Sequence, residues 1–240
     1  MTPTADVTVT AGWAPVRGVV FDYHCTLAHG GDPADWLDAA WTHLRRPGTP
    51  RAAFTEPGYA ALLDFLDHIW EHAGRVDPHG ERDRGPERHR AVFDAVARLR
   101  PEMDPGRDAQ LAKALYATML EVWAPYPDAA ATLGELRARG IRTAVLSNMG
   151  LDLHPVLARE GLAEHLDGVV LSWECGVVKP APGAFAAAMA VLDLPAEAVL
   201  MVGDNAIDDA GAAAVGIRTV LLPRSVGGAE RGLGIVSRMV

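Results

Sequence analysis

The sequence predicts an α/β protein with a doubly wound parallel sheet, interrupted after its first strand by an inserted all-helical segment. Short apolar runs alternate with helical patterns from residue 128 to residue 222, which is typical of parallel βαβ units. The stretch 29–121 contains only helical patterns. Apolar residues make up 49% of the 240 residues, enough for a packed core.

The core elements follow from the apolar runs and the residues that bound them. Val16 to Phe21 is the first predicted strand. The later predicted strands are 141–146, 169–172, 198–202 and 217–222, and the helices between them are 128–139, 155–160, 182–192 and 208–215. Gly140 and Gly216 end two of these helices, since glycine reaches the left-handed region that commonly follows a helix.

The inserted segment is predicted to form four amphipathic helices. They cover residues 33–45, 58–72, 87–100 and 108–123, with a loop at 73–85. Asp32 and Pro33 supply an N-cap and a first-turn proline to the first of them. We therefore expect a core formed by residues 1–28 and 122–240 and a helical insert formed by residues 29–121.

Charge and cysteine content limit the partners. The net charge of −9 argues against a nucleic-acid-binding protein, which would present a basic face. The two cysteines, Cys25 and Cys175, do not indicate a disulfide framework. Residues 1–14 lack a secretory pattern, and no apolar run approaches the roughly 18 residues that cross a bilayer. We expect a cytoplasmic protein that binds neither nucleic acid nor a membrane. The sequence does not indicate an oligomeric state.

Carboxylates, a hydroxyl and a lysine follow the predicted strands. They are Asp22, Ser147, Lys179, Asp204 and the adjacent pair Asp208 and Asp209. Because parallel strands end at one edge of a sheet, these side chains should gather there. Converging carboxylates require a cation, and a hard divalent ion such as Mg²⁺ suits them. A carboxylate nucleophile beside a metal, a lysine and a hydroxyl indicates a site for phosphoryl transfer.

The order of these residues resembles the four motifs of the haloacid dehalogenase-like (HAD) hydrolases. The run from Asp22 to Thr26 resembles the first motif, usually Asp-x-Asp-x-Thr, and Ser147 in Leu-Ser-Asn resembles the second. Lys179 in Val-Lys-Pro resembles the third, and Gly-Asp204 with Asp208 the fourth. The long gap between the first two motifs resembles that of family members with a helical cap inserted directly after the first motif, the C1 arrangement. The resemblance covers 16–222 and implies a Rossmann-like core.

The resemblance implies a role for each residue. Asp22 would be the catalytic nucleophile and a metal ligand, and the backbone carbonyl of His24 would be a second ligand. Asp204 and Asp208 would complete a Mg²⁺ site, with Asp209 as the alternative to Asp208. Phosphate would be bound by Ser147, Asn148 and Lys179. The implied activity is Mg²⁺-dependent hydrolysis of a small organic phosphomonoester through an aspartyl-phosphate on Asp22.

His24 departs from the family pattern. Phosphatases of the family carry at this position an aspartate that protonates the leaving alkoxide, and histidine can do the same general acid–base work. Three alternatives stay open: a phosphatase in which His24 is the catalytic acid/base, a metal-free dehalogenase-type hydrolase, which carries an aromatic residue here, or a catalytically attenuated binding or regulatory protein.

Two further patterns have plainer interpretations. His68 and His72, with Glu71, match the His-x-x-Glu-His pattern of some zinc peptidases, but the sequence offers no evident third ligand. A polar face on a partly exposed helix is the plainer interpretation. Cys25 adjoins the site and is expected to be a small buried filler. The tryptophans of the insert, Trp36, Trp41 and Trp70, are expected to pack in its interior.

Overall fold

A five-stranded parallel sheet forms the centre of the core. The computed structural model describes residues 14–100, 105–223 and 229–240. The sheet order is β5-β4-β1-β6-β7, formed by β1 (Gly18–Phe21), β4 (Arg142–Ser147), β5 (Gly168–Leu171), β6 (Val199–Gly203) and β7 (Arg218–Leu221). From β1 the chain adds β4 and β5 on one side, then crosses to β6 on the other. The carboxyl end of β1 is therefore the switch point at which such sheets place their ligand sites.

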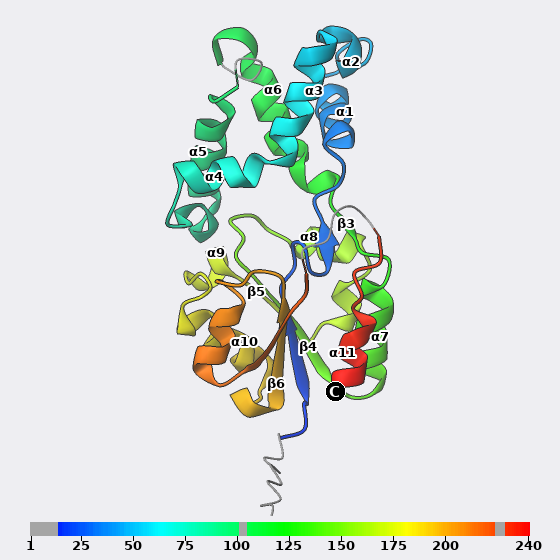
Figure 1. The fold of residues 1–240 in the computed structure, drawn as a ribbon, viewed down its shortest axis with the longest axis vertical. Helices are drawn as coiled ribbons and strands as arrows, with labels where there is room; N and C mark the ends of the chain where they lie inside the picture. Colours follow the sequence, from blue (N-terminus) through cyan, green and yellow to red (C-terminus); the bar gives the residue numbers. More distant parts are fainter. Residues whose placement is uncertain (1–13, 101–104, 224–228) are drawn as a thin grey trace, which may run out of the picture.

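Helices cover both faces of this sheet, as the sequence predicts (Figure 1). Successive residues of a strand point to opposite faces. Val19 and Phe21 belong to the apolar cluster beneath α7 (Ala129–Ala138), α8 (His154–Arg159) and α11 (Gly234–Met239). Val20 belongs to the cluster beneath α10 (Pro182–Leu192) and the 3₁₀ turn η5 (Ala210–Val215). The doubly wound α/β fold is confirmed.

The inserted segment is helical and lies above the carboxyl edge of the sheet (Figure 1). Its elements, which we call the cap, are α1 (Pro33–His43), α2 (Pro50–Ala53), α3 (Glu56–Asp67), α4 (Ile69–Val76), η1 (Glu81–Arg84), α5 (Pro86–Ala97), α6 (Pro105–Thr118) and η2 (Met119–Glu121). Asp32 caps α1 by accepting a hydrogen bond from the Ala34 amide at 2.7 Å. The cap has its own apolar cluster, which includes Trp36 and Leu115.

A two-stranded antiparallel ribbon joins the cap to the core. It pairs β2 (Ala28–His29) with β3 (Ala124–Pro125), the segments through which the chain enters and leaves the cap. The expected domain boundaries, 28/29 and 121/122, lie in or beside this ribbon. The division into 1–28 with 122–240 and 29–121 stays a prediction.

The prediction of one continuous helix over 58–72 was wrong, because the structure has two helices there, α3 and α4. The break is at His68, whose φ of −102° and ψ of 16° lie outside the helical range. Leu62, Phe65 and Leu66 of α3 and Ile69 of α4 all belong to the cap cluster, so both helices pack on it. The His68 ring nitrogen contacts the Asp64 carbonyl at 2.8 Å, while the His72 ring stacks on Phe65. The two histidines thus do not share one continuous helical face, which removes the geometric basis of the zinc pattern.

Other differences are local. The loop expected at 73–85 contains the end of α4 and η1, and the short helices α2 and α9 (Ser172–Cys175) were not predicted. The helix expected over 208–215 is the 3₁₀ turn η5, because the Asp209 carboxylate folds the preceding loop tightly. The expected lead-in over 1–15 falls almost wholly outside the described residues. Within the described part of the chain, no helix combines the length and apolar character needed to cross a membrane.

Candidate active site

Asp22 lies at the end of the central strand. Its backbone amide donates to the Val202 carbonyl at 2.9 Å, so β6 sets the position of the residue. The carboxylate Oδ2 accepts from the Thr26 hydroxyl at 3.3 Å, and Oδ1 accepts from Lys179 Nζ at 2.7 Å. Asp22 is 8% exposed. A nearly buried carboxylate whose orientation is fixed by a hydroxyl and an ammonium group can act as a nucleophile.

Lys179 joins two carboxylates. Its Nζ donates to Asp22 Oδ1 and, at 2.6 Å, to Asp209 Oδ1, and its side chain is almost fully buried. The main chain of Lys179 is held by the Asn148 side chain, which accepts from the Lys179 amide at 2.7 Å and donates to its carbonyl at 2.9 Å. The Asn148 side chain therefore positions the lysine, and its expected contact with phosphate stays a prediction.

Burial shifts the protonation equilibria of this pair. Removal from water raises the pKa of Asp22 to about 7, against the opposing charge of Lys179. Burial by itself lowers the pKa of Lys179, but the carboxylates of Asp22 and Asp209 outweigh it and hold that pKa above its ordinary value. Lys179 therefore stays charged, and its charge favours the ionised form of Asp22.

The structure brings Asp209, rather than Asp208, into contact with Lys179. Asp209 is fully buried, and its Oδ2 accepts from the backbone amides of Asp204 and Asn205 at 3.0 and 2.9 Å. Asp208 accepts from Asn205 Nδ2 at 3.0 Å and lies outside the described group of converging carboxylates. Gly203 permits this arrangement, because a Cβ there would lie 2.1 Å from Asp209 Oδ2. Adjacent aspartates in the sequence carry no signal that separates their roles.

The converging carboxylates suit a hard cation. One oxygen from each of Asp22, Asp204 and Asp209 lies within 4.8 Å of the others. Burial raises the pKa of Asp204, and the charge of Asp209 adds to the rise. Among the described residues, Lys179 is the cation that hydrogen-bonds to these carboxylates, and Arg231 acts on Asp204 through its charge alone, so the three carboxylates keep surplus negative charge in a largely buried site. Oxygen donors with surplus negative charge are the ligands that Mg²⁺ prefers.

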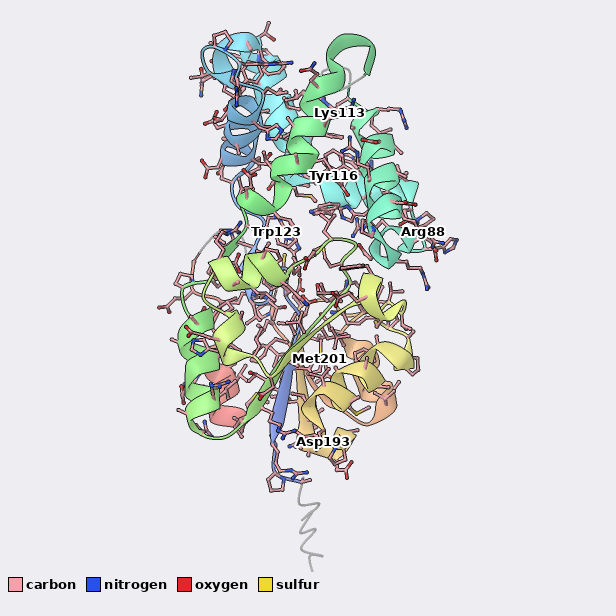
Figure 2. The ribbon with its side chains drawn as sticks, turned by 180° about the vertical axis from the view of Figure 1, so that it is seen from behind. Arg88, Lys113, Tyr116, Trp123, Asp193 and Met201 are labelled. Carbon is pink, nitrogen blue, oxygen red and sulfur yellow. The ribbon has the colours of Figure 1, made fainter. Side chains whose placement is uncertain are left out.

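His24 lies at the junction of core and cap. Its ring stacks on Trp123, with ring centroids 4.6 Å apart and an interplanar angle of 25°. Figure 2 shows Trp123 at this junction, below the cap helices. A Cβ on Gly30, just beyond β2, would lie 3.3 Å from His24 Nε2, and Cys25 Sγ lies 3.6 Å from Nδ1. The ring is thus held against the chain that enters and leaves the cap.

The other predicted site residue, Ser147, is where the sequence placed it. It ends β4 beside β1 and is buried. The expected hydrogen bond from its hydroxyl to phosphate stays a prediction, as does the expected ligand role of the His24 carbonyl.

The cap contacts the core two residues beyond Asn148. A Cβ on Gly150 would lie 2.4 Å from the Arg82 carbonyl oxygen and 2.8 Å from the His89 Cβ, so glycine permits this close approach. The Ser172 hydroxyl accepts from the Met149 amide at 2.9 Å and donates to the Asp83 carbonyl of η1. Asp83 is itself buried, which raises its pKa to about 6. The loop that follows Ser147 thus holds the rim of the cap.

We expect Gly150→Ala to separate the cap from the core and to raise KM for any substrate enclosed between them about tenfold, since small displacements of positioning groups are costly. The added methyl group collides with the backbone of Arg82, which cannot move away by rotating a side chain. Steady-state kinetics of the two proteins would measure this. The control is Gly74→Ala, because no atom lies within 4 Å of a Cβ there. An unchanged KM in Gly150→Ala would contradict the expectation.

A buried aspartate at the switch point of a parallel sheet, paired with a lysine beneath a helical cap, is an arrangement typical of an α/β enzyme site. The chain belongs to the haloacid dehalogenase-like hydrolases, whose family model matches residues 16–216. The family membership that the four motifs indicated is thereby confirmed.

Similar proteins include both phosphatases and dehalogenases. A ribulose-1,5-bisphosphate 5-phosphatase of Halopiger xanaduensis is 39% identical over 123 residues, which cover 50% of this chain and 52% of that one. A (S)-2-haloacid dehalogenase 1 of a Pseudomonas species is 40% identical over 100 residues, covering 41% and 44%. The chain thus spans about half the length of these curated relatives. The structure of an L-2-haloacid dehalogenase from Xanthobacter autotrophicus matches with a TM-score of 0.61 and 24% identity, covering 89% of this chain and 80% of that one.

Proposed function

We propose that the protein is a Mg²⁺-dependent phosphatase that hydrolyses a small organic phosphomonoester. The observation that carries the proposal is the cluster of Asp22, Asp204 and Asp209 around a single lysine. Displacement of a halide from carbon by a carboxylate needs no metal, whereas the surplus negative charge of this cluster calls for a second cation. The similarity to a phosphatase supports the same choice.

The residues of the site suit a two-step displacement. In the first step an Asp22 oxygen attacks phosphorus, and the bond from phosphorus to the ester oxygen breaks. The departing oxygen takes a proton from His24, and Lys179 neutralises charge on the transferring phosphoryl group. In the second step water attacks the aspartyl-phosphate and gives a proton to His24, which releases inorganic phosphate and restores Asp22.

The carboxylates of Asp22, Asp204 and Asp209 would hold the Mg²⁺, which puts Asp209 in the place expected for Asp208 and makes Asp208 the alternative. When bound, the ion supplies charge that polarises the phosphoryl oxygens. Lys179 binds one oxygen of Asp22 and one of Asp209. The second Asp209 oxygen accepts from two backbone amides and the second Asp22 oxygen from the Thr26 hydroxyl, so a metal would share these oxygens with their present donors.

One observation favours a second candidate, a metal-free dehalogenase-type hydrolase. The His24 ring packs flat against Trp123, as an ordinary aromatic side chain would, and the similarity to a dehalogenase accords with this. A panel of sugar, nucleotide and organic acid phosphates, assayed with Mg²⁺ and with EDTA, separates the two. We expect phosphate release that EDTA abolishes. Chloride release from 2-chloropropionate in EDTA, without phosphate release from any ester, would establish the second candidate instead.

We expect His24→Gln to lower kcat about a hundredfold, because an amide cannot transfer the proton, and His24→Asp to retain more activity than His24→Gln. The two variants also differ in their pH profiles. A carboxyl group ordinarily titrates near pH 4 and an imidazole near 6.5, so His24→Asp should move to lower pH the alkaline limb of kcat/KM, which reports loss of the proton from the general acid. Rates measured from pH 5 to 9 test this. A large gain in rate with Asp would instead mean that His24 attenuates the natural enzyme.

A further inference from the structure

The C-terminal segment reaches the active-site loop through Arg231. This residue is 6% exposed, and its Nε donates to the Cys25 carbonyl oxygen at 2.7 Å, across a sequence separation of 206 residues. Cys25 lies between Asp22 and Thr26, in the loop that carries the candidate nucleophile. A nearly buried arginine from the end of the chain therefore contacts the backbone of this loop directly.

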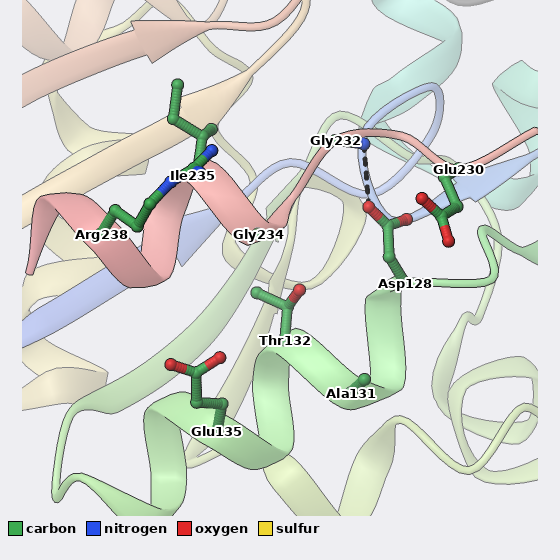
Figure 3. Close-up of a pocket in the computed structure, with 9 residues that line it drawn as sticks. All are labelled: Asp128, Ala131, Thr132, Glu135, Glu230, Gly232, Gly234, Ile235 and Arg238. Carbon is green, nitrogen blue, oxygen red and sulfur yellow. Dashed lines mark hydrogen bonds between the residues drawn. The ribbon is translucent and has the colours of Figure 1, made fainter.

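Asp128 holds the backbone on either side of this arginine. The Asp128 carboxylate accepts hydrogen bonds from three successive amides, those of Arg231, Gly232 and Leu233, at 2.9, 2.8 and 2.7 Å. Figure 3 shows the carboxylate turned toward Gly232, with the segment passing over the start of α7. Asp128 directly precedes α7. The arginine thus extends from a backbone that is fixed to the core.

Arg231 contacts a residue whose backbone conformation is energetically unfavourable. Cys25 has a φ of 64°, in the left-handed region that side-chain-bearing residues rarely adopt. Its amide donates to the Ala28 carbonyl at 2.7 Å, and its carbonyl accepts from Arg231. The next residue, Thr26, donates its hydroxyl to the Asp22 carboxylate. A change at Cys25 would therefore move the group that orients Asp22.

The remaining surroundings of the guanidinium are aromatic and acidic. Its carbon lies 5.7 Å from the centre of the Tyr126 ring, just beyond β3. Its charge opposes the rise in the pKa of Asp204. Nη2 is buried and has no hydrogen-bond partner among the described residues. Leaving one donor of a buried cation unpaired carries a desolvation cost in free energy. The contacts that the guanidinium does make must offset this cost, which suggests that they contribute to the fold or to the site.

We propose that Arg231 is a positioning residue of the active site, which fixes the loop from Asp22 to Ala28 by binding the Cys25 carbonyl. The Asp128 carboxylate, which binds the amides of residues 231–233, holds the guanidinium in place, so the local anchor of Arg231 and not the whole segment 229–240 completes the site. Only the kinetic arm of the test rests on the proposed phosphatase function.

The test compares Arg231→Ala with a control that loosens the same segment elsewhere. Arg139, which directly follows α7, donates to the carbonyls of Ser237 in α11 and of Val240 just after it, and no bond links it to the Asp22 loop within the described structure. Hydrogen–deuterium exchange of the peptide covering 22–28 is the first measurement. We expect exchange at least about tenfold faster in Arg231→Ala and unchanged exchange in Arg139→Ala.

Kinetics provide a second measurement. Arg231→Ala should lower kcat about tenfold to a hundredfold with little change in KM, since the nucleophile is displaced while the cleft is retained. Millimolar guanidinium should restore part of the rate, and the same concentration of NaCl should not. If Arg231→Ala does not fold, Arg231→Met, which keeps most of the buried volume, carries the same measurements.

Two results would overturn the proposal. One is exchange of residues 22–28 that is the same in Arg231→Ala, or Arg231→Met, as in the natural protein. The other is equal acceleration in Arg139→Ala, which would mean that docking of the segment, rather than the guanidinium, orders the loop. If the natural protein hydrolyses no phosphate ester, the proposed function fails while the exchange comparison still decides the role of Arg231.

Discussion

Asp22→Asn is expected to abolish phosphate ester hydrolysis, lowering kcat by at least about a thousandfold. The amide keeps the size of the carboxylate; its oxygen can accept from Lys179, and its NH2 group can donate to the Thr26 hydroxyl, so the site should hold its shape. What is lost is the nucleophilic oxygen that forms the bond to phosphorus. Inorganic phosphate released from an aryl phosphate, followed over hours at high enzyme concentration, provides the required sensitivity.

The control for this prediction is Asp32→Asn. Asp32 caps α1, and asparagine caps a helix about as well as aspartate. The control should therefore keep full activity and the same unfolding transition. An Asp22→Asn protein that retains a tenth of the natural rate would exclude Asp22 as the nucleophile and with it the aspartyl-phosphate.

Lys179→Met is expected to cost about 3–5 kcal/mol of the free energy of unfolding and to abolish activity, because it leaves two buried carboxylates without their shared cation. Methionine fills most of the space, so the loss arises from charge rather than from a cavity. Urea unfolding at pH 7.5 measures it. The control is Lys113→Met, the other lysine of the chain, whose side chain is exposed and which should change stability by less than about 0.5 kcal/mol.

The cost of Lys179→Met should fall as the pH falls. Without Lys179, the burial that already raises the pKa of Asp22 to about 7 acts unopposed, so that pKa rises further. A carboxyl whose pKa is higher in the folded than in the unfolded state binds more protons when folded, so stability increases as the pH falls from above the folded value toward the unfolded one. Adding Asp209→Asn should recover part of the lost stability but none of the activity. A penalty that is independent of pH would contradict this account.

Much of the fold was predictable, because it depends on local patterns. Apolar runs of four to six residues bounded by glycine or proline mark buried strands, and their alternation with helical patterns leaves few alternatives to a parallel sheet. Asp22 and Lys179 could be assigned to one edge for the same reason, since both follow such strands. The helix break at His68 could not be predicted, because the apolar spacing continues through it and no glycine or proline marks the position.

Local sequence patterns were sufficient to predict the fold class, the helical insert and the set of chemical groups at the sheet edge. The reason is that the periodicity of burial and the ends of strands depend on residues that are close together in the sequence. Only the tertiary structure decided that Asp209 rather than Asp208 contacts Lys179, that Asn148 holds the lysine backbone, and that Arg231 reaches Cys25. These choices depend on a tight 3₁₀ turn and on contacts between residues 30 to 206 positions apart. Such contacts form only when separate elements pack, so no local pattern records them.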